Sequence, residues 1–123
     1  MGIAANAAVV LVALLHVYFL VLEMFLWTKP YGRRTFRLTP EYAEASASLA
    51  ANQGLYNGFL AAGLLWGLSL GDHDGMGFAV KMFFLICVVI AGVFGALTAS
   101  RKILFFQAVP GAVALALTWL ARG

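Results

Sequence analysis

Two ionisable side chains, His16 and Glu23, interrupt an otherwise apolar run near the start of the chain. Because they are seven positions apart, a helix places them on the same face, about 10 Å from each other along its axis. Ionisable groups inside a membrane segment are rare, usually face the interior of a bundle, and often mark binding or proton-transfer sites. The pair therefore predicts ligand-binding or acid–base chemistry within an apolar environment.

A second polar group lies in the segment NQGLYNG, where Asn52, Gln53, Tyr56 and Asn57 fall on one arc of a helix. Arg101 lies in a tight turn further along the chain and Gln107 on its flank, and we expect both at a similar depth. The candidate ligand-binding residues are His16, Glu23, Asn52, Gln53, Tyr56, Asn57, Arg101 and Gln107.

Each of these residues also has a structural interpretation. Amides and phenols within membrane helices often serve only as hydrogen bonds between helices. Glu23 is close enough to the end of its apolar run to be solvated, or to pair with Arg101 for structural reasons. A neutral histidine bonded to a helix carbonyl is a common way to bury His16.

Four apolar stretches must position these side chains, at about residues 3–27, 48–70, 77–99 and 103–121. Each has about the 20 residues that a helix needs to cross a bilayer. The composition agrees, since 63% of the residues are hydrophobic and 11% are charged. We therefore predict an all-α fold, an integral membrane four-helix bundle that forms a single transmembrane domain over residues 1–123.

The basic residues predict how this bundle is oriented. The loop 28–47 and the turn 100–102 carry most of them, namely Lys29, Arg33, Arg34, Arg37, Arg101 and Lys102. The positive-inside rule places both connections in the cytoplasm and both termini on the non-cytoplasmic side. Lys81 and Arg122 are exceptions that lie near helix ends, where we expect them to extend outward to the interface. The net charge of +3 thus indicates membrane topology, with the lipid bilayer and not nucleic acid as partner.

Several local signals refine the elements. Thr39, Pro40 and Glu41 form a helix-start pattern, so the second helix is expected to begin near Pro40. Pro110 predicts a kink in the last helix. Asp72, His73 and Asp74 read as a solvated turn rather than as a metal site. Glycines four apart, such as Gly54 and Gly58, predict close helix packing within the bundle, with homo-oligomerisation as the alternative.

No catalytic signature, metal-ligand spacing or cofactor motif occurs in the sequence. Three functions remain open. The first is binding or transport of a small or amphipathic ligand, with Glu23 as the ionisable contact and the amides as orienting groups. The second is a membrane enzyme on a lipophilic substrate, with His16 or Glu23 as acid or base and Tyr56 as donor. The third is a subunit or assembly factor that docks a partner.

Three segments carry a resemblance to a known family: LHVYFLVLEMFLW, TKPYGRRTFRL and AANQGLYNGFLAAGL. With them the chain resembles, over essentially its whole length, domain-of-unknown-function family 1304, which comprises small bacterial inner-membrane proteins. The resemblance implies a four-helix, multi-pass protein of the inner membrane and implies no activity.

In scaffold alone, the chain also looks like the glutathione-handling membrane enzymes. Their second helix carries a basic residue, then Asn, then an acid followed by Tyr. Asn52 and Tyr56 fit that spacing, whereas Ser48 and Leu55 stand where the basic residue and the acid belong.

Overall fold

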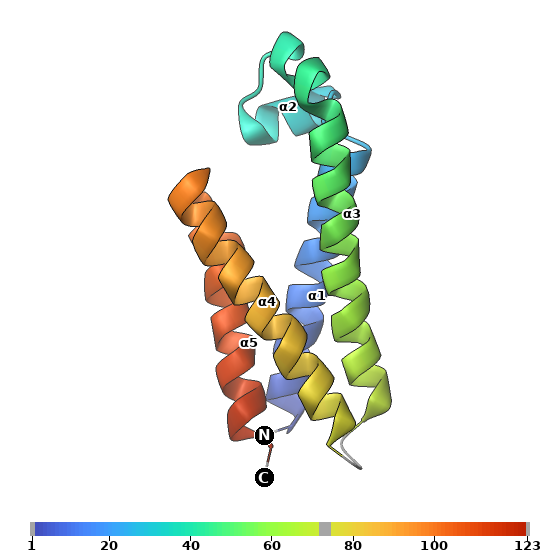
Figure 1. Ribbon diagram of the computed structural model, residues 1–123, viewed down its shortest axis with the longest axis vertical. Coiled ribbons are helices and arrows are strands. Elements are labelled where there is room, and N and C mark those ends of the chain that lie inside the picture. Colours follow the sequence, from blue (N-terminus) through green and yellow to red (C-terminus); the bar gives the residue numbers. More distant parts are fainter. Residues whose placement is uncertain (1, 72–74, 123) are drawn as a thin grey trace. The chain divides into compact units, whose positions relative to one another are not determined.

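The computed structural model describes residues 2–71 and 75–122. Over these ranges the regular structure is entirely helical, as Figure 1 shows. The elements are α1 (Gly2–Met24), α2 (Pro30–Phe36), α3 (Pro40–Leu70), α4 (Met76–Thr98), the π-helix η1 (Leu104–Ala108) and α5 (Val109–Leu120). The residues predicted to form a solvated turn, Asp72, His73 and Asp74, lie outside the described ranges.

The all-helical prediction is confirmed, and each predicted apolar stretch coincides with a helix. Within the described chain, α1 and α4, 23 residues each, are long and apolar enough to span a membrane. The apolar helix Leu104–Leu120 is shorter. α3 is the longest helix, at 31 residues, and its first turns carry the acids Glu41 and Glu44.

The segment predicted as a loop, 28–47, is largely helical. α1 ends at Met24, three residues before the predicted end, and Pro30 is the first residue of a further helix, α2. The predicted start of the second helix is confirmed, because α3 begins at Pro40 and the Tyr42 amide donates a hydrogen bond of 3.1 Å to Thr39 Oγ1. A threonine oxygen in this position satisfies one of the amides that the first helical turn leaves unpaired.

The predicted interruption near Pro110 takes the form of a change in hydrogen-bond register. Pro110 has no N–H to donate, and the turns that precede it form the π-helix η1, at the end of which the Val109 amide donates to the Leu104 carbonyl. Single-turn π segments of this kind are frequent where a helix must adjust around such a break.

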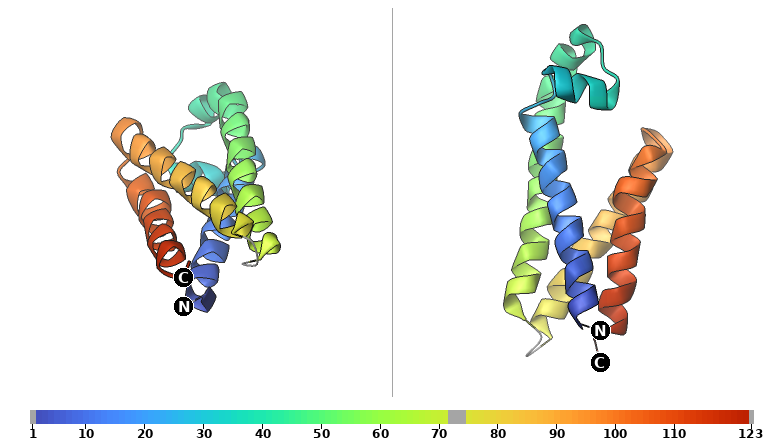
Figure 2. Two further views of the ribbon diagram at one scale, coloured as in Figure 1. Left: turned by 60° about the horizontal axis from the view of Figure 1, so that its bottom comes forward. Right: turned by 180° about the vertical axis from the view of Figure 1, so that it is seen from behind.

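The chain forms two compact units, which are described separately. Unit 1 comprises Met1–Leu15 and Leu60–Gly123, and unit 2 comprises His16–Phe59. The core of unit 1 consists of buried apolar side chains from α1, α3, α4 and α5: Val9, Val12, Ala13, Leu64, Leu85, Val88 and Ala114. The first turn of α1 and the last turn of α5 lie at the same end of this unit (Figures 1 and 2).

Glycines bring the helices of unit 1 together. A Cβ on Gly92 of α4 would lie 2.6 Å from the backbone nitrogen of Ala108, so a larger residue would force α4 away from η1. A Cβ on Gly111 of α5 would lie 2.7 Å from Val88 Cγ1. These glycine faces are occupied inside the unit, in agreement with the packing role predicted for small residues.

Unit 2 contains the second half of α1, the short helix α2 and the first half of α3. Gly32 of α2 is buried directly on the chain that follows α1, because a Cβ at this position would overlap the backbone carbonyl of Leu26. Two side-chain contacts of Trp27 fix the same region: its indole N–H donates to Ser46 Oγ at 2.9 Å, and its ring lies 4.9 Å from that of Phe36.

Candidate functional site

In unit 2, the predicted acid and one predicted amide form a direct pair. Asn57 Nδ2 of α3 donates a hydrogen bond of 2.5 Å to Glu23 Oε1 of α1. Asn57 is 7% exposed, and Glu23 is half-buried. Depth matching between the two helices predicted this neighbourhood, and a hydrogen bond between apolar helices is the expected way to hold a buried polar group.

Two glycines set the distance between α1 and α3 at this pair. A Cβ on Gly54 would lie 2.7 Å from Met24 Cγ and 3.1 Å from Glu23 Cβ. One turn further along α3, a Cβ on Gly58 would lie 2.8 Å from Leu20 Cδ1. The small-xxx-small spacing therefore allows the close approach that brings Asn57 within bonding distance of Glu23.

His16 is fully buried in unit 2. Its ring packs edge-on against Phe19, with 5.3 Å between the ring centroids. This is the environment of a core residue, in line with the structural interpretation of His16.

The other predicted site residues are less enclosed. Asn52, Gln53 and Tyr56 are exposed on α3. The buried face of this part of the helix is formed by Ala50, Gly54 and Asn57, three to four positions apart, so the residues between them face outward. Arg101 and Gln107 belong to unit 1, where Arg101 is exposed after α4 and Gln107 is half-buried in η1. A ligand-contacting role for these residues stays a prediction.

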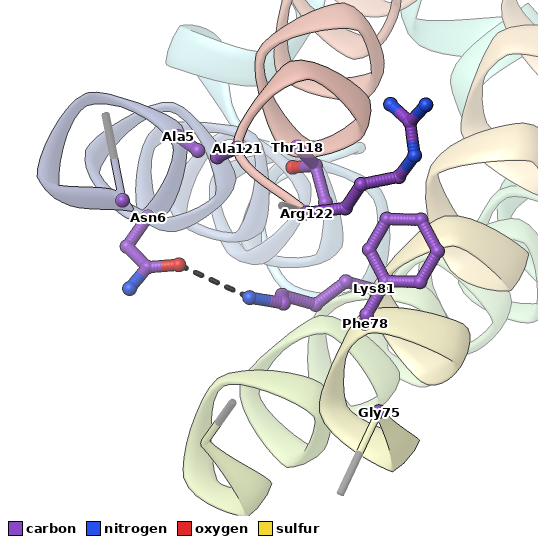
Figure 3. Close-up of a pocket in the computed structure, with 9 residues that line it drawn as sticks. Ala5, Asn6, Gly75, Phe78, Lys81, Thr118, Ala121 and Arg122 are labelled. Atoms are coloured by element: carbon purple, nitrogen blue, oxygen red, sulfur yellow. Dashed lines mark hydrogen bonds between the residues drawn. The ribbon is translucent and has the colours of Figure 1, made fainter. Parts of the chain in front are cut away.

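Unit 1 contains a polar cavity that the sequence analysis did not anticipate. Its volume is about 220 Å³, and it lies at the end of the unit where α1 and α4 begin and α5 ends. Five of its lining residues matter below: Asn6, Phe78, Lys81, Thr118 and Arg122. We call this space the Lys81 cavity, and Figure 3 shows it in close-up.

Lys81 corrects one prediction. It was expected to extend outward to the membrane interface, but it is 4% exposed, and its Nζ donates a hydrogen bond of 3.1 Å to Asn6 Oδ1 (Figure 3). The reason lies on α3, where Gly67 leaves room for the lysine stem: a Cβ there would lie 2.7 Å from Lys81 Cγ. The missing side chain of Gly67 thus lets the ammonium group stay inside the unit.

Thr118 supplies a second buried polar group to this cavity. It is 3% exposed, and its Oγ1 has no hydrogen-bond partner within the described chain. A buried hydroxyl without a partner costs about 1–3 kcal/mol, so such groups are rare unless they await a ligand or water. Thr118 is one of the residues that line the cavity, so its unmet hydroxyl lies next to this space.

Arg122 completes the polar wall. Its Nη1 donates a hydrogen bond of 2.6 Å to the Trp119 carbonyl, and its guanidinium carbon lies 3.8 Å from the centre of the Trp119 ring. Lys81 and Arg122 give the cavity two cationic side chains, and the described residues that line it include no acid. The arrangement suits a small anion, which a cation, a hydroxyl and an amide can hold together.

The sequence did contain a signal for this cavity. Asn6 lies in the first turns of its helix, Lys81 in the early part of another, and Thr118 near the end of a third. Antiparallel neighbours bring such positions to one level, so the three polar residues could have been grouped by depth. No group of three His, Cys, Asp or Glu side chains that could hold a metal occurs among the described residues.

Comparison with known proteins gives a family but no activity. The model of the family described as "Protein of unknown function (DUF1304)" matches residues 10–119. The chain is 31% identical over 99 residues to the uncharacterized protein YpaA of Lactococcus lactis subsp. lactis (strain IL1403), with 79% of this chain and 81% of YpaA covered. No solved structure matches the chain.

Proposed function

The chain belongs to the DUF1304 family, and from that premise we propose that it is a multi-pass protein of the inner membrane that binds a small amphipathic ligand. The Lys81 cavity receives the ligand's anionic group. The observation that carries this proposal is the buried Lys81 side chain on the wall of a cavity that is also lined by Thr118, whose buried hydroxyl has no partner within the described chain.

Membrane insertion is supported by the outer surface of the helices. α1 and α4 have the length and composition of membrane spans. Large apolar side chains are exposed along both, including Leu11, Leu14, Ile90, Phe94 and Leu97. Water-soluble proteins rarely expose contiguous apolar patches of this kind, whereas lipid accommodates them without cost.

Reporter fusions test the insertion and its orientation. Alkaline phosphatase fused after residue 122 should be active in the periplasm, and the same fusion after Arg37 should be inactive. The converse pattern is expected for green fluorescent protein. Activity at both positions, or recovery of the chain in the soluble fraction, would contradict the proposed topology.

The chemistry of the cavity limits the ligand. A volume of about 220 Å³ is smaller than most drug-sized pockets, so it fits a headgroup and a short chain rather than a whole lipid. A carboxylate can accept a charge-assisted hydrogen bond from Lys81 Nζ. Phe78 supplies apolar surface to the same cavity.

Thermal unfolding of the purified full-length chain in a nonionic detergent tests the ligand. Octanoate is expected to raise the Tm, and octanamide, which has the same length but no charge, is not. At about 100 times its Kd a ligand stabilises a protein by about 2.7 kcal/mol, enough to measure. Lys81→Met should abolish the octanoate shift, while the matched control Lys102→Met, at an exposed lysine, should keep it. Equal shifts with octanoate and octanamide would refute the cavity as an anion site.

A second candidate site is the Glu23–Asn57 pair of unit 2. Within the described chain, the structure gives the Glu23 carboxylate one hydrogen-bond partner, so its other oxygen can accept a bond from a ligand. A carboxylate selects a cationic or hydrogen-bond-donating group, and octylamine is the corresponding probe. A Tm rise with octylamine that Glu23→Gln removes would support this site, and a rise that the variant retains would refute it.

Binding is proposed ahead of catalysis because of the surroundings of His16. A general acid or base must reach the substrate. The His16 ring is fully buried against Phe19.

A further inference from the structure

Three arginines of unit 2 surround an open hollow that plays no part in the function proposed above. Arg33 and Arg34 come from the last turn of α2, and Arg37 follows the helix. Together with Pro30 and Leu38 they line a space of about 370 Å³, which we call the arginine hollow. These residues belong to the segment TKPYGRRTFRL, for which neither candidate ligand site supplies a role.

The backbone conformation of Arg37 is the first observation that indicates a function for the arginine hollow. Arg37 has φ 56° and ψ 49°, the left-handed conformation that ends α2. The Leu38 amide donates to the Arg33 carbonyl at 2.9 Å and the Arg37 amide to the Arg34 carbonyl at 3.4 Å, a Schellman-type helix end. Glycine or asparagine normally occupies this position, because a Cβ is strained there. A helix stop alone therefore does not explain an arginine.

The second observation that indicates a function concerns the hydrogen bonds and charges of the hollow, beginning with Arg33. Its Nε is buried and has no hydrogen-bond partner. No acidic side chain is among the described residues that line the hollow, whose wall carries three guanidinium groups. A guanidinium group is a planar fork of donors that matches the oxygens of phosphate or carboxylate. Three of them around one space, none paired with an acid within the described chain, form an anion receptor.

α2 is held firmly enough to keep this receptor in shape. Gly32 lies directly against the Leu26 carbonyl, and the hydroxyls of Tyr31 and Tyr18 are hydrogen-bonded at 2.5 Å. One turn further along the helix from Gly32, Phe36 packs against Trp27. The arginines therefore project from a fixed platform, and little ordering is needed on binding.

We propose that the arginine hollow binds the phosphate of an anionic phospholipid headgroup. Tyrosines that neighbour the arginines in sequence favour a lipid as the source, because Tyr31 and Tyr42 are exposed, and tyrosine is enriched at the headgroup level of a bilayer. α1, one of the candidate membrane spans, ends at Met24, shortly before α2 begins. Basic clusters next to a membrane helix attract the anionic lipids of the cytoplasmic leaflet.

The test uses the full-length protein in a nonionic detergent, with lipid binding followed by native mass spectrometry and thermal unfolding. Phosphatidylglycerol is expected to bind one per chain and about tenfold more tightly than phosphatidylcholine of the same chain length. Inorganic phosphate is the third probe, and it should neither raise the Tm nor displace the lipid at equal concentration. None of these readouts involves Lys81, so the arginine hollow and the Lys81 cavity can fail separately.

Arg37→Gly is the decisive variant, because glycine fits the left-handed conformation and the helix end is preserved. It should weaken phosphatidylglycerol binding about tenfold, the effect of removing one strong charge-assisted contact, while the Tm without lipid stays equal or rises. Arg33→Lys keeps the charge but loses the fork, and a several-fold weakening is expected there as well. Arg101→Gln, at an exposed arginine of unit 1, is the matched control and should bind the lipid as the wild type does.

Three outcomes would overturn the proposal. Equal weakening by Arg37→Gly and Arg101→Gln would mean diffuse attraction between a basic protein and an anionic lipid. Equal binding of the two lipids would remove the headgroup preference. Inorganic phosphate that competes at equal concentration would assign the hollow to a free phosphate and not to a membrane lipid.

Discussion

Each unit contains one pair in which a side-chain amide bonds to an ionisable group on another helix. In unit 2, Asn57 donates to the Glu23 carboxylate at 2.5 Å, and in unit 1 the Lys81 ammonium donates to Asn6 at 3.1 Å. A glycine stands beside each ion, Gly54 next to Glu23 and Gly67 next to Lys81. An amide is thus paired with an acid in unit 2 and with a base in unit 1; the glycine lies on the helix of the amide in unit 2 and on a third helix, α3, in unit 1.

The surroundings of the two pairs differ. The Lys81 pair borders a cavity, where the Thr118 hydroxyl is buried without a partner. In the Glu23 pair the carboxylate is half-buried, and the Asn57 amide is buried on the face of α3 that packs against α1. A hydrogen-bonded pair between two packed helices is explained by its role in holding them together. A buried hydroxyl without a partner beside a cavity has no such structural explanation. The comparison therefore ranks the Lys81 cavity ahead of the Glu23–Asn57 pair as a ligand site.

The largest expected effect comes from filling the glycine beside each pair. Gly67→Leu would place a Cβ 3.0 Å from the Lys81 backbone nitrogen, and Gly54→Leu a Cβ 3.1 Å from Glu23 Cβ. Since overpacking of this kind forces helices apart, each variant should lose about 3 kcal/mol of unfolding free energy. Titration with sodium dodecyl sulfate from mild detergent measures the loss. Gly2→Leu, at a position with nothing within 4 Å, is the control. Wild-type unfolding of both variants would refute the close approach.

Removing the amides separates the two pairs. Asn6→Leu deprives the buried Lys81 ammonium of an acceptor, and Asn57→Leu deprives the half-buried Glu23 carboxylate of a donor. We expect a loss of about 1–3 kcal/mol for each, with the larger loss for Asn6→Leu because Lys81 is 4% exposed. The same detergent titration gives both values, and the exposed Asn52→Leu should stay within about 0.5 kcal/mol of wild type. A larger loss of stability for Asn57→Leu than for Asn6→Leu would contradict the expected order of the two variants.

The helices were predictable because long apolar runs favour a conformation that satisfies every backbone hydrogen bond within the segment. The start of α3 was predictable as well, since Thr39 and Pro40 are a local signal that acts through one hydrogen bond. The neighbourhood of Glu23 and Asn57 followed from the direction in which the chain enters each helix. These inferences use only sequence distance and helix geometry.

The Lys81 cavity and α2 were missed for a shared reason. Lys81 stays inside because Gly67 on another helix makes room for it, and α2 is anchored because Gly32 fits against the Leu26 carbonyl. Both features depend on which helix faces pack against each other. The sequence of a single chain determines this only through tertiary packing, which local patterns do not reveal. The expectation that a lysine near a helix end extends outward is a general rule, which tertiary contacts override at Lys81.

Thr118→Val tests the unmet hydroxyl that distinguishes unit 1. Valine has nearly the same shape but no polar atom to bury, so the variant should gain about 1 kcal/mol of stability while it loses affinity for octanoate. Thr98→Val is the matched control, because the Thr98 hydroxyl already donates to the Phe94 carbonyl at 2.7 Å. Thermal unfolding with and without octanoate gives both quantities. A Thr118→Val protein that is less stable than Thr98→Val would show that the hydroxyl is satisfied.

The smallest effect is expected for Glu23→Gln, and it decides what the acid of unit 2 is for. The glutamine oxygen can still accept the hydrogen bond from Asn57, so the link between α1 and α3 survives and stability should change by about 0.5 kcal/mol or less. Glu41→Gln, on the exposed first turn of α3, provides the baseline in the same unfolding titration. If Glu23→Gln instead cost as much as Asn57→Leu, the charge itself would be part of the packing. Glu23 would then be a structural ion, and the octylamine site would lose its ionisable contact.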